Sequence, residues 1–510
     1  MLVKTFSATV LGIDAVTITI EVNLGQGINF FLVGLPDSAV KESQQRIKAA
    51  FSNNNLKYPG REITINMAPA DIRKEGSVFD LPIAIGILAA SDQVRSIELD
   101  HYMIMGELSL DGELRPLKGV LPIALAARNE GFKGVIVPSL NAEEAALVDG
   151  IDVYPANTLM DVIDHLNDKN KIAPLRRSIE DQVESLQHEI DMDFKDVKGQ
   201  MNIKRAFEIA AAGGHNIILI GPPGAGKSML AKRLPGILPP MSIDEALETT
   251  KIHSVAGKVR KEQSLVTGRP FRKPHHTISD VALVGGGSYP QPGEISLAHN
   301  GVLFLDELPE YKRTVLEVMR QPMEDRYVTI SRSKFTVDFP TKFMLVAAMN
   351  PCPCGYYNHP DKECTCGSAQ VQRYLSKVSG PLMDRIDLHV EVTPVNYDDL
   401  ANDVPKEGSK EIRQRVIAAR LIQIDRYSVS PTTSNATMSS KELKSYCRLD
   451  DGGKELLKTA MDRLGLSARA YDRILKVART IADLDYQPYI LAKHLAEAIQ
   501  YRSLDKSKLF

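Results

Sequence analysis

The eight residues from Gly221 to Ser228 constrain the fold of this chain more than any other feature. They read Gly-Pro-Pro-Gly-Ala-Gly-Lys-Ser, after the apolar run Asn216–Ile220 and before the helical run Met229–Leu234. Glycines let such a loop wrap so that successive backbone N–H groups point at one phosphate, and the helix N-terminus adds positive potential. A strand, a glycine-rich loop and a helix in this order predict a phosphate-binding loop in a parallel α/β sheet.

The side chains of this loop suit a nucleoside triphosphate. Lys227 can reach the β- and γ-phosphates, and the Ser228 hydroxyl can ligate Mg²⁺. ATP and Mg²⁺ are therefore the predicted cofactors. The alternative, a glycine-rich turn with a coincidental Lys-Ser pair, does not explain the flanking strand and helix. The predicted nucleotide-binding residues are Gly221, Pro222, Pro223, Gly224, Ala225, Gly226, Lys227, Ser228 and Met229.

Two later apolar strands end in polar residues that suit hydrolysis. Gly301–Leu305 runs into Asp306 and Glu307, and Phe343–Met349 runs into Asn350. Asp306 is predicted to hold the Mg²⁺ hydration shell, Glu307 to polarise the attacking water and Asn350 to orient that water. Taken alone, each strand end also fits an ordinary turn. The phosphate loop upstream favours the catalytic interpretation.

Composition narrows the class of protein. The 510 residues carry 62 Lys and Arg against 64 Asp and Glu, a net charge of −2, so any nucleic-acid site must be a local patch. No apolar run reaches 18 residues, so no membrane span is expected. Four of the five cysteines lie between positions 352 and 366, which indicates a cytoplasmic protein with a local metal site.

The pattern along the chain predicts three domains. Residues 1–166 mix strands and helices, 167–191 form a charged linker, 192–394 form the α/β nucleotide-binding core and 395–510 form a helical domain. The predicted strands of the first domain are Ala15–Val22, Glu62–Met67 and Gly134–Pro138, and its helices Val40–Phe51, Leu81–Ala90 and Leu121–Asn129. The predicted C-terminal helices are Glu411–Arg426, Lys454–Leu464, Ala468–Leu484 and Ile490–Tyr501.

The insertion 351–367 contains two Cys-x-Cys pairs, Cys352 with Cys354 and Cys364 with Cys366. Four thiolates in a cytosolic chain favour a tetrahedral structural zinc site. The pairs are closer than the usual Cys-x₂₋₄-Cys spacing, so a free-thiol loop and an iron–sulfur cluster stay open as alternatives. His359 is a weaker spare ligand, and Cys447 is predicted to be a plain thiol.

Six motifs together resemble the AAA+ ATPases of the helix-2-insert clade, and more closely the ComM/YifB magnesium chelatase-like proteins. The similarity spans nearly the whole chain. It implies a P-loop AAA+ module with a helical lid and an N-terminal α+β domain. The motifs are GPPGAGKS (221–228), GRPFRKPHHTISDVALVGGG (268–287), NGVLFLDELPE (300–310), VMRQPMEDRYVTISR (318–332), MNPCPCG (349–355) and GPLMDRIDL (380–388).

The resemblance also assigns roles at subunit boundaries. Arg385 matches the arginine finger, which reaches the nucleotide of a neighbouring subunit and neutralises charge on the γ-phosphoryl group. A homo-oligomeric ring follows, with a hexamer as the expected form. An ion pair of Arg385 with Asp384 or Asp387 is the alternative from the residues alone.

Two further nucleotide contacts follow from the same resemblance. Arg469 matches the sensor 2 arginine that couples the lid to the nucleotide, and Arg473, one turn later, could substitute for it. Val197 and Gln200 belong to a segment that lines the adenine.

Two basic elements are candidates for DNA contact. The first is a loop with two prolines, which cannot be a helix interior and carries Arg269, Arg272, Lys273, His275 and His276. The second is a predicted hairpin, Tyr327–Arg332 with Lys334–Phe339, whose tip carries Arg332 and Lys334. In the clade these match the helix-2 insert and the pre-sensor hairpin, which face the ring channel. A solvated loop or an intersubunit contact is the alternative for the first.

The N-terminal domain resembles the proteolytic domain of Lon-type proteases at 68–81 and 105–117. Its natural alignment places Val78 at the serine position and Ile123 at the lysine position, whereas Ser77 and Lys118 lie off register. A Ser/Lys dyad is therefore absent, and we predict a catalytically inactive domain with a scaffold or binding role.

The sequence thus predicts an ATPase that works as a DNA motor, a helicase or branch-migration translocase in homologous recombination of incoming DNA during natural transformation. Its partners would be single-stranded or branched DNA and further copies of the chain, with no membrane. One rival is a chelatase-type AAA+ ATPase that remodels a protein partner. A second is a nucleotide-gated scaffold with slow turnover.

Overall fold

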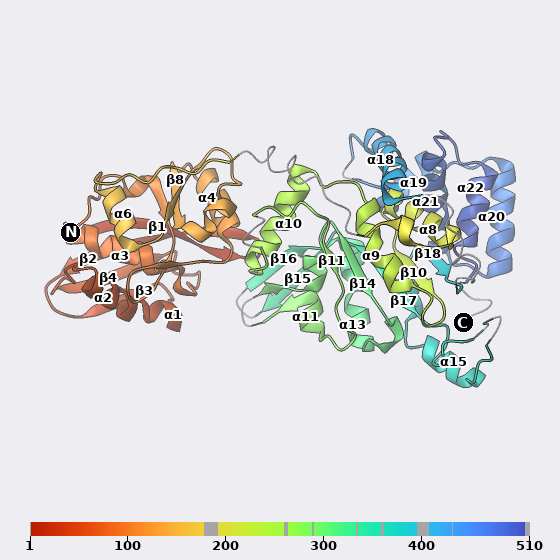
Figure 1. Ribbon diagram of the computed structural model, residues 1–510, viewed down its shortest axis with the longest axis horizontal. Coiled ribbons are helices and arrows are strands. Elements are labelled where there is room, and N and C mark those ends of the chain that lie inside the picture. The colour runs from red at the N-terminus through yellow and green to blue at the C-terminus, as the bar shows by residue number, and fades with distance from the viewer. Residues whose placement is uncertain are drawn as a thin grey trace. The chain divides into compact units, whose positions relative to one another are not determined.

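The computed structural model describes residues 2–177, 192–259, 264–287, 290–332, 335–357, 359, 362–394, 407–430 and 432–504 (Figure 1). Contacts divide the chain into two compact units. The first unit comprises Met1–Gln187 and Ser242–Thr267, and the second comprises His188–Met241 and Gly268–Phe510. The segment Ser242–Thr267 therefore packs with the N-terminal part, although the sequence analysis placed it inside the core 192–394.

The first unit is built on a seven-stranded mixed sheet in the order β3-β4-β2-β1-β5-β8-β9. The pairs β1–β2 and β2–β4 are antiparallel, and the other neighbours are parallel. A short separate hairpin joins β6 (Glu107–Leu108) and β7 (Leu114–Arg115). The sheet strands are β1 (Leu2–Leu11), β2 (Asp14–Gly25), β3 (Phe30–Val33), β4 (Glu62–Ala68), β5 (Tyr102–Ile104), β8 (Gly134–Pro138) and β9 (Asp152–Ala156).

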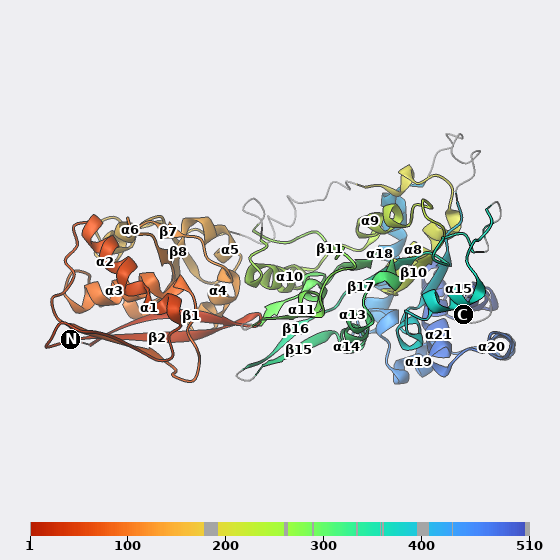
Figure 2. The ribbon, with the colours of Figure 1, turned by 90° about the horizontal axis from the view of Figure 1, so that it is seen from below.

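Helices α3 (Asp80–Ala90) and α4 (Val120–Asn129) pack on strands β1 and β2 (Figure 2). Every residue of α3 is buried, as expected for a helix that is apolar on all sides. The strands and helices predicted for this region are confirmed, with ends shifted by a few residues. The remaining helices are α1 (Ser38–Lys41), α2 (Ser43–Asn53), α5 (Ala142–Ala145) and α6 (Leu159–Leu166).

Helix α10 (Ile243–Val255) is held on the first unit by polar contacts. The Ser254 hydroxyl donates to the buried Glu144 carboxylate, and the Gly119 amide donates to the Ser254 carbonyl at 3.2 Å. Lys251 forms an ion pair with Asp14 at 2.8 Å. These contacts explain why a segment that follows the nucleotide-binding helix in sequence belongs to the N-terminal unit.

The second unit contains a five-stranded parallel sheet in the order β11-β14-β17-β10-β18. Ile220, the last residue of β10, lies opposite Met349 of β17 and Glu391 of β18. Because all five strands run in the same direction, their carboxyl ends meet at one edge. The strands are β10 (Ile217–Ile220), β11 (Phe271–Arg272), β14 (Val302–Leu305), β17 (Met344–Met349) and β18 (Leu388–Glu391).

Apolar side chains leave both faces of this sheet in alternation. Ile217 and Leu219 pack into one core with α8 (Met201–Gly213) and α9 (Lys227–Ile237), whereas Ile218 and Ile220 pack into a second core on the opposite face. A parallel sheet covered on both faces confirms the predicted α/β class. The second core is completed by α11 (Asp280–Val284), α12 (Glu294–Leu297), α13 (Arg313–Val318), α14 (Arg320–Asp325), α15 (Ser368–Leu375) and α16 (Gly380–Met383).

The C-terminal part is helical, and its four predicted helices are confirmed. None of the helices in the described ranges is both long and apolar enough to span a membrane. The helices are α18 (Ser409–Arg426), α19 (Ser440–Tyr446), α20 (Asp451–Leu464), α21 (Ala468–Leu484) and α22 (Ala492–Gln500).

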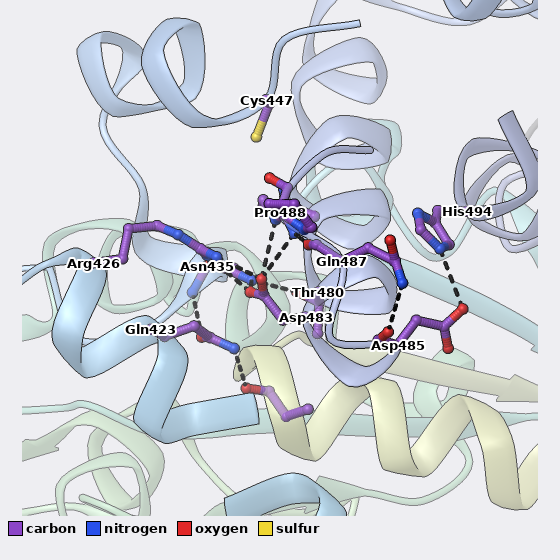
Figure 3. A network of polar contacts seen from close by, with 12 residues as sticks. Gln423, Arg426, Asn435, Cys447, Thr480, Asp483, Asp485, Gln487, Pro488 and His494 are labelled. Carbon is purple, nitrogen blue, oxygen red and sulfur yellow. Dashed lines mark hydrogen bonds and ion pairs between the residues drawn. The ribbon is translucent and has the colours of Figure 1, made fainter. Parts of the chain in front are cut away.

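A fully buried carboxylate organises this helical part (Figure 3). Asp483 of α21 accepts hydrogen bonds from Arg426 at 2.8 Å, from Arg479 at 3.1 Å and from the Asn435 amide at 2.8 Å. Nearby, burial raises the pKa of Cys447 to about 12, so this thiol stays protonated and unreactive, as predicted for it. Asp483 thus joins α18, α21 and the loop between them.

We predict that Asp483→Asn destabilises the protein by about 3–5 kcal/mol, because it leaves two buried guanidinium groups without their counter-charge. The matched control is Asp485→Asn. Asp485 pairs with Lys493 at 2.7 Å but is one-third exposed, so its loss should cost about 1 kcal/mol or less. Urea denaturation followed by circular dichroism measures both. Equal losses in the two variants would contradict the organising role of Asp483.

Candidate nucleotide and metal sites

The phosphate loop leaves the carboxyl end of β10 and enters α9 at Lys227. Gly226 has a φ of 82°, a left-handed conformation that side chains with a Cβ rarely adopt. The turn that aims backbone N–H groups inward therefore depends on this glycine. The structure brings together the predicted residues of the loop as the sequence indicated.

Lys227 lies in the loop and contacts the tip of a neighbouring strand. Its ammonium group donates to the Gly221 carbonyl at 2.6 Å, to the Pro222 carbonyl at 2.9 Å and to Asn350 Oδ1 at 3.0 Å. Burial lowers the pKa of Lys227 to about 8. Asn350, predicted from its place at the end of β17, is thus confirmed as a neighbour of the phosphate loop.

Ser228 and Asp306, the two residues predicted to supply oxygen ligands for Mg²⁺, are in direct contact. Ser228 Oγ donates to Asp306 Oδ2 at 2.7 Å, and Lys273 Nζ lies 2.8 Å from the same oxygen. Burial raises the pKa of Asp306, but the hydrogen bonds from Lys273 and Ser228 outweigh it and hold the pKa below its usual value. A hydroxyl beside an ionised carboxylate suits a hard cation such as Mg²⁺.

Glu307 has a strained backbone and an accessible carboxylate. Its φ is 51°, a left-handed value that is uncommon for a residue with a side chain, and its side chain is 60% exposed. His276 Nδ1 lies 3.5 Å from its carboxylate. The accessible carboxylate directly follows Asp306, at the position where the sequence predicts a water-polarising base.

The basic loop predicted to touch DNA contacts backbone carbonyls and three carboxylates, those of Glu294, Asp306 and Glu307. Arg269 donates to the Pro239 and Asn300 carbonyls at 2.6 and 2.7 Å. Arg272 holds Glu294 through two hydrogen bonds at 2.6 and 2.7 Å. Lys273 contacts Asp306, and His276 contacts Glu307. The tilted rings of His275 and His276 lie against each other.

Sequence reasoning thus missed Lys273 and His276 as neighbours of Asp306 and Glu307. The only available signal was their place just after β11, which pairs with β14, the strand that directly precedes Asp306. Their contact with DNA stays a prediction.

The second DNA candidate is a hairpin, as predicted. Strands β15 (Tyr327–Arg332) and β16 (Phe335–Pro340) pair with Arg332 opposite Phe335. Lys334 and the side chain of Arg332 lie outside the described part of the chain.

The predicted adenine segment contacts the phosphate loop. Gln200 donates from Nε2 to the Ala225 carbonyl at 3.1 Å and to the Thr393 carbonyl at 3.3 Å. Val197 is buried in the adjoining core. The segment therefore supports the loop from the side of α8.

Arg385 lies at the amino end of β18, at the opposite edge of the sheet. It is buried, donates to the Pro381 carbonyl at 2.7 Å and pairs with Glu324 at 2.8 Å. The intramolecular ion pair raised as the alternative is therefore formed, but with Glu324 as its acidic partner and not with Asp384 or Asp387. Asp387 instead binds Arg473.

A cavity of about 360 Å³ opens beside Arg385. Four cationic residues line it, namely Arg326, Arg385, Arg473 and Lys476. Arg473 is therefore the arginine of α21 that shares this cavity with Arg385, whereas Arg469 is exposed in the first turn of that helix.

The four clustered cysteines converge on one point. Their sulfur atoms lie within 4.8 Å of one another, with separations of 3.3, 3.7 and 3.6 Å among Cys352, Cys354 and Cys364. A hydrogen bond from the Tyr356 backbone leads the effects that lower the pKa of Cys354 to about 5, which favours its thiolate. Four thiolates about 2.3 Å from zinc lie about 3.8 Å apart, so the cluster fits such an ion.

Three family models match this chain. They are described as "Magnesium chelatase, subunit ChlI" over residues 193–400, "Subunit ChlI of Mg-chelatase" over 20–141 and "Magnesium chelatase, subunit ChlI C-terminal" over 406–502. The competence protein ComM of Haemophilus influenzae is 46% identical over 98% of this chain and 97% of its own length. The YifB protein of Escherichia coli is 45% identical over 97% of this chain and 96% of its own.

The chain belongs to the ComM/YifB family of magnesium chelatase-like proteins. This AAA+ family assignment indicates an ATPase that uses ATP and Mg²⁺. The Rv2897c protein of Mycobacterium tuberculosis is also similar, with 41% identity over 98% of each chain.

The family's N-terminal region is related to Lon proteases. Lon protease 2 of Bacillus subtilis is 32% identical over 132 residues, which is 25% of this chain and 23% of that protein. At the two dyad positions, Ile123 is buried in α4 and Val78 packs against the core of the first unit. The neighbouring Ser77 hydroxyl donates to Glu107. The catalytic inactivity of this domain stays a prediction.

The pKa of Lys227 generates a prediction about nucleotide affinity. Below about pH 8 the ammonium is charged and attracts phosphate, and as the pH rises through this value the free protein loses that charge. We therefore expect affinity for Mg²⁺-nucleotide to fall above about pH 8 by up to tenfold per pH unit. Fluorescent-nucleotide titrations at several pH values measure it. Lys227→Arg stays charged and should abolish the dependence, whereas an unchanged slope would refute the assignment.

Proposed function

We propose that this protein is a ring-shaped, ATP-driven DNA motor, a helicase or branch-migration translocase that acts in homologous recombination of incoming DNA. The name of the competence protein ComM supports the link to DNA uptake. The single observation that carries the ring is the placement of Arg385 at the sheet edge opposite to the phosphate loop.

The distance between these two edges decides how Arg385 can act. Ile217 pairs with Leu388 and Ile220 pairs with Glu391, so the four-residue strand separates the segment of Arg385 from the loop that follows Ile220. Four residues span about 13 Å at roughly 3.3 Å each. Arg385 pairs with Glu324 at the edge opposite to the phosphate loop, so it does not contact the nucleotide of its own chain. It is available to the nucleotide of a second copy, and a closed ring, with a hexamer as the proposed form, supplies that copy.

The proposed catalytic roles follow from the contacts at the edge of the sheet where β10, β14 and β17 end. Lys227 and the loop hold the phosphates, Ser228 and Asp306 hold Mg²⁺, and Glu307 polarises the water that Asn350 orients. His276 and Lys273 link the same carboxylates to the basic loop. Any force on that loop would therefore change the hydrolytic site directly, which suits a motor whose hydrolysis responds to its substrate.

The DNA path is proposed along the β15–β16 hairpins of the ring. Six basic hairpin tips, each with Arg332 and Lys334, would follow the phosphate backbone of single-stranded or branched DNA even in a protein with a net charge of −2. We propose that this activity takes place in the cytoplasm, where ATP and DNA are both available.

We also propose that Cys352, Cys354, Cys364 and Cys366 bind a structural zinc ion. The support is the convergence of four sulfur atoms at separations suited to tetrahedral coordination.

A chelatase-type ATPase that remodels a protein partner is the second candidate, and the descriptions of the three matching family models favour it. It would use the same hydrolytic residues. The response of hydrolysis to DNA separates the two functions.

We predict that single-stranded or forked DNA stimulates ATP hydrolysis several-fold and that Glu307→Gln abolishes basal and stimulated activity while nucleotide still binds. Glu310→Gln is a matched control, because Glu310 pairs with the exposed Lys377 at 3.3 Å and takes no part in hydrolysis. A coupled phosphate-release assay measures the rates. A rate of ATP hydrolysis that no form of DNA changes would contradict the motor proposal and favour the protein-remodelling function.

We further predict that Arg385→Ala and Lys227→Ala each lower the rate of hydrolysis by about 10³-fold or more. An equimolar mixture should regain activity, because a Lys227→Ala subunit still offers its Arg385 to the intact phosphate loop of an Arg385→Ala neighbour. Hydrolysis is measured before and after mixing, with circular dichroism to confirm folding. A mixture no more active than the two variants apart would show that Arg385 does not act between subunits.

A further inference from the structure

The cysteine cluster lies on a loop, Cys352–Cys366, that begins two residues after Asn350. Asn350 accepts a hydrogen bond from Lys227 at 3.0 Å, so the start of this cysteine loop is tied to the phosphate loop. Cys352 is fully buried in the same core as Met349 and Tyr374. The first thiol is therefore anchored, whereas the other three are partly exposed.

A second contact joins the two loops directly. Gly355 has a φ of 86°, and a Cβ placed on it would lie 2.4 Å from Cδ of Pro223. The backbone of the cysteine loop thus abuts the phosphate loop with no room for a side chain. Pro223 immediately precedes Gly224, in the part of the loop that wraps the phosphates.

The turn that makes this contact is bounded by cluster thiols. Gly355 directly follows Cys354, and its amide donates to the Cys352 carbonyl at 3.0 Å. Cys364, from the far end of the loop, lies 3.7 Å from Cys352 and 3.6 Å from Cys354. A metal held by these sulfurs would lock the two ends of the loop together, and the locked turn includes Gly355.

We propose that the metal at the cysteine cluster positions the phosphate loop, so that its occupancy sets nucleotide affinity through the Gly355–Pro223 contact. The inference rests on the proposed zinc and on the ATP site of the family. Gly355 and the four cysteines are positioning residues, because none of them contacts the reacting atoms. A misplacement of the phosphate loop by about 1 Å is enough to cost about a hundredfold in function.

Two variants separate the metal from the contact. Cys354→Ser removes one ligand, whereas Gly355→Ala keeps all four thiols, crowds Pro223 and strains a backbone with a φ of 86°. Gly367→Ala is the matched control, because a Cβ there meets nothing within 4 Å and its φ is an ordinary −65°.

The experiment measures zinc content by elemental analysis and nucleotide affinity with a fluorescent ATP analogue, on the full chain, with Mg²⁺ and without DNA. We expect one zinc ion per wild-type chain. Cys354→Ser and chelator-treated wild type should lose zinc and bind nucleotide at least tenfold more weakly. Gly355→Ala should keep zinc and lose a similar factor, whereas Gly367→Ala should match wild type.

A Pro223→Gly background tests whether the contact itself is responsible. Removal of the proline ring should make the effect of Gly355→Ala smaller, and this non-additivity identifies the contact. Zinc-free protein that binds nucleotide as tightly as wild type, a cluster that binds no metal, or a Gly355→Ala variant equal to Gly367→Ala would each overturn the inference. This binding experiment contains no DNA, so it tests the inference separately from the motor proposal. Wild type that binds zinc and nucleotide here, but whose hydrolysis is not stimulated by DNA in the separate assay, would contradict the motor proposal alone.

Discussion

The parallel alignment of β14, β17 and β10 is the constraint on which the rest of the second unit depends. Because the three strands end at one edge, Asp306, Asn350 and the phosphate loop are delivered to a single point. Lys227 then bridges to Asn350, and Ser228 bridges to Asp306. The same alignment places the residues before the strands at the other edge. One sheet therefore separates the residues predicted to hold a nucleotide from Arg385, the arginine proposed to complete the site of a neighbouring copy.

Charged groups are concentrated at the edge of the sheet that carries the phosphate loop, and this arrangement lowers the stability of the fold. Burial depresses the pKa of Lys227, and Glu307 keeps a left-handed backbone that would relax elsewhere. Both features oppose stability, so they persist only because the covered sheet holds them. A bound phosphate group would favour the charged form of Lys227, so the site is most stable when nucleotide is bound.

Much of this arrangement could be predicted from sequence, because strand ends and glycine spacing are local signals. The phosphate loop, Asp306, Asn350 and the helix Ala468–Leu484 were located in this way. The contacts of Lys273 with Asp306 and of Arg385 with Glu324 could not be predicted, since they join segments whose proximity depends on the packing of the whole sheet. For the same reason the attachment of α10 to the first unit was missed. The Ser254–Glu144 bond that holds it joins residues 110 positions apart.

Buried polar bonds also connect the helical part to the far edge of the sheet. His215, two residues before β10, lies 2.8 Å from the Thr480 hydroxyl of α21 and 3.5 Å from Asp387. Asp387 accepts the Asn216 amide at 2.9 Å, and the Asn216 side chain donates to the Arg385 carbonyl at 3.3 Å. Burial lowers the pKa of His215 and keeps it neutral, so the junction is held by hydrogen bonds and packing. Any displacement of α21 therefore acts on the segment that carries Arg385.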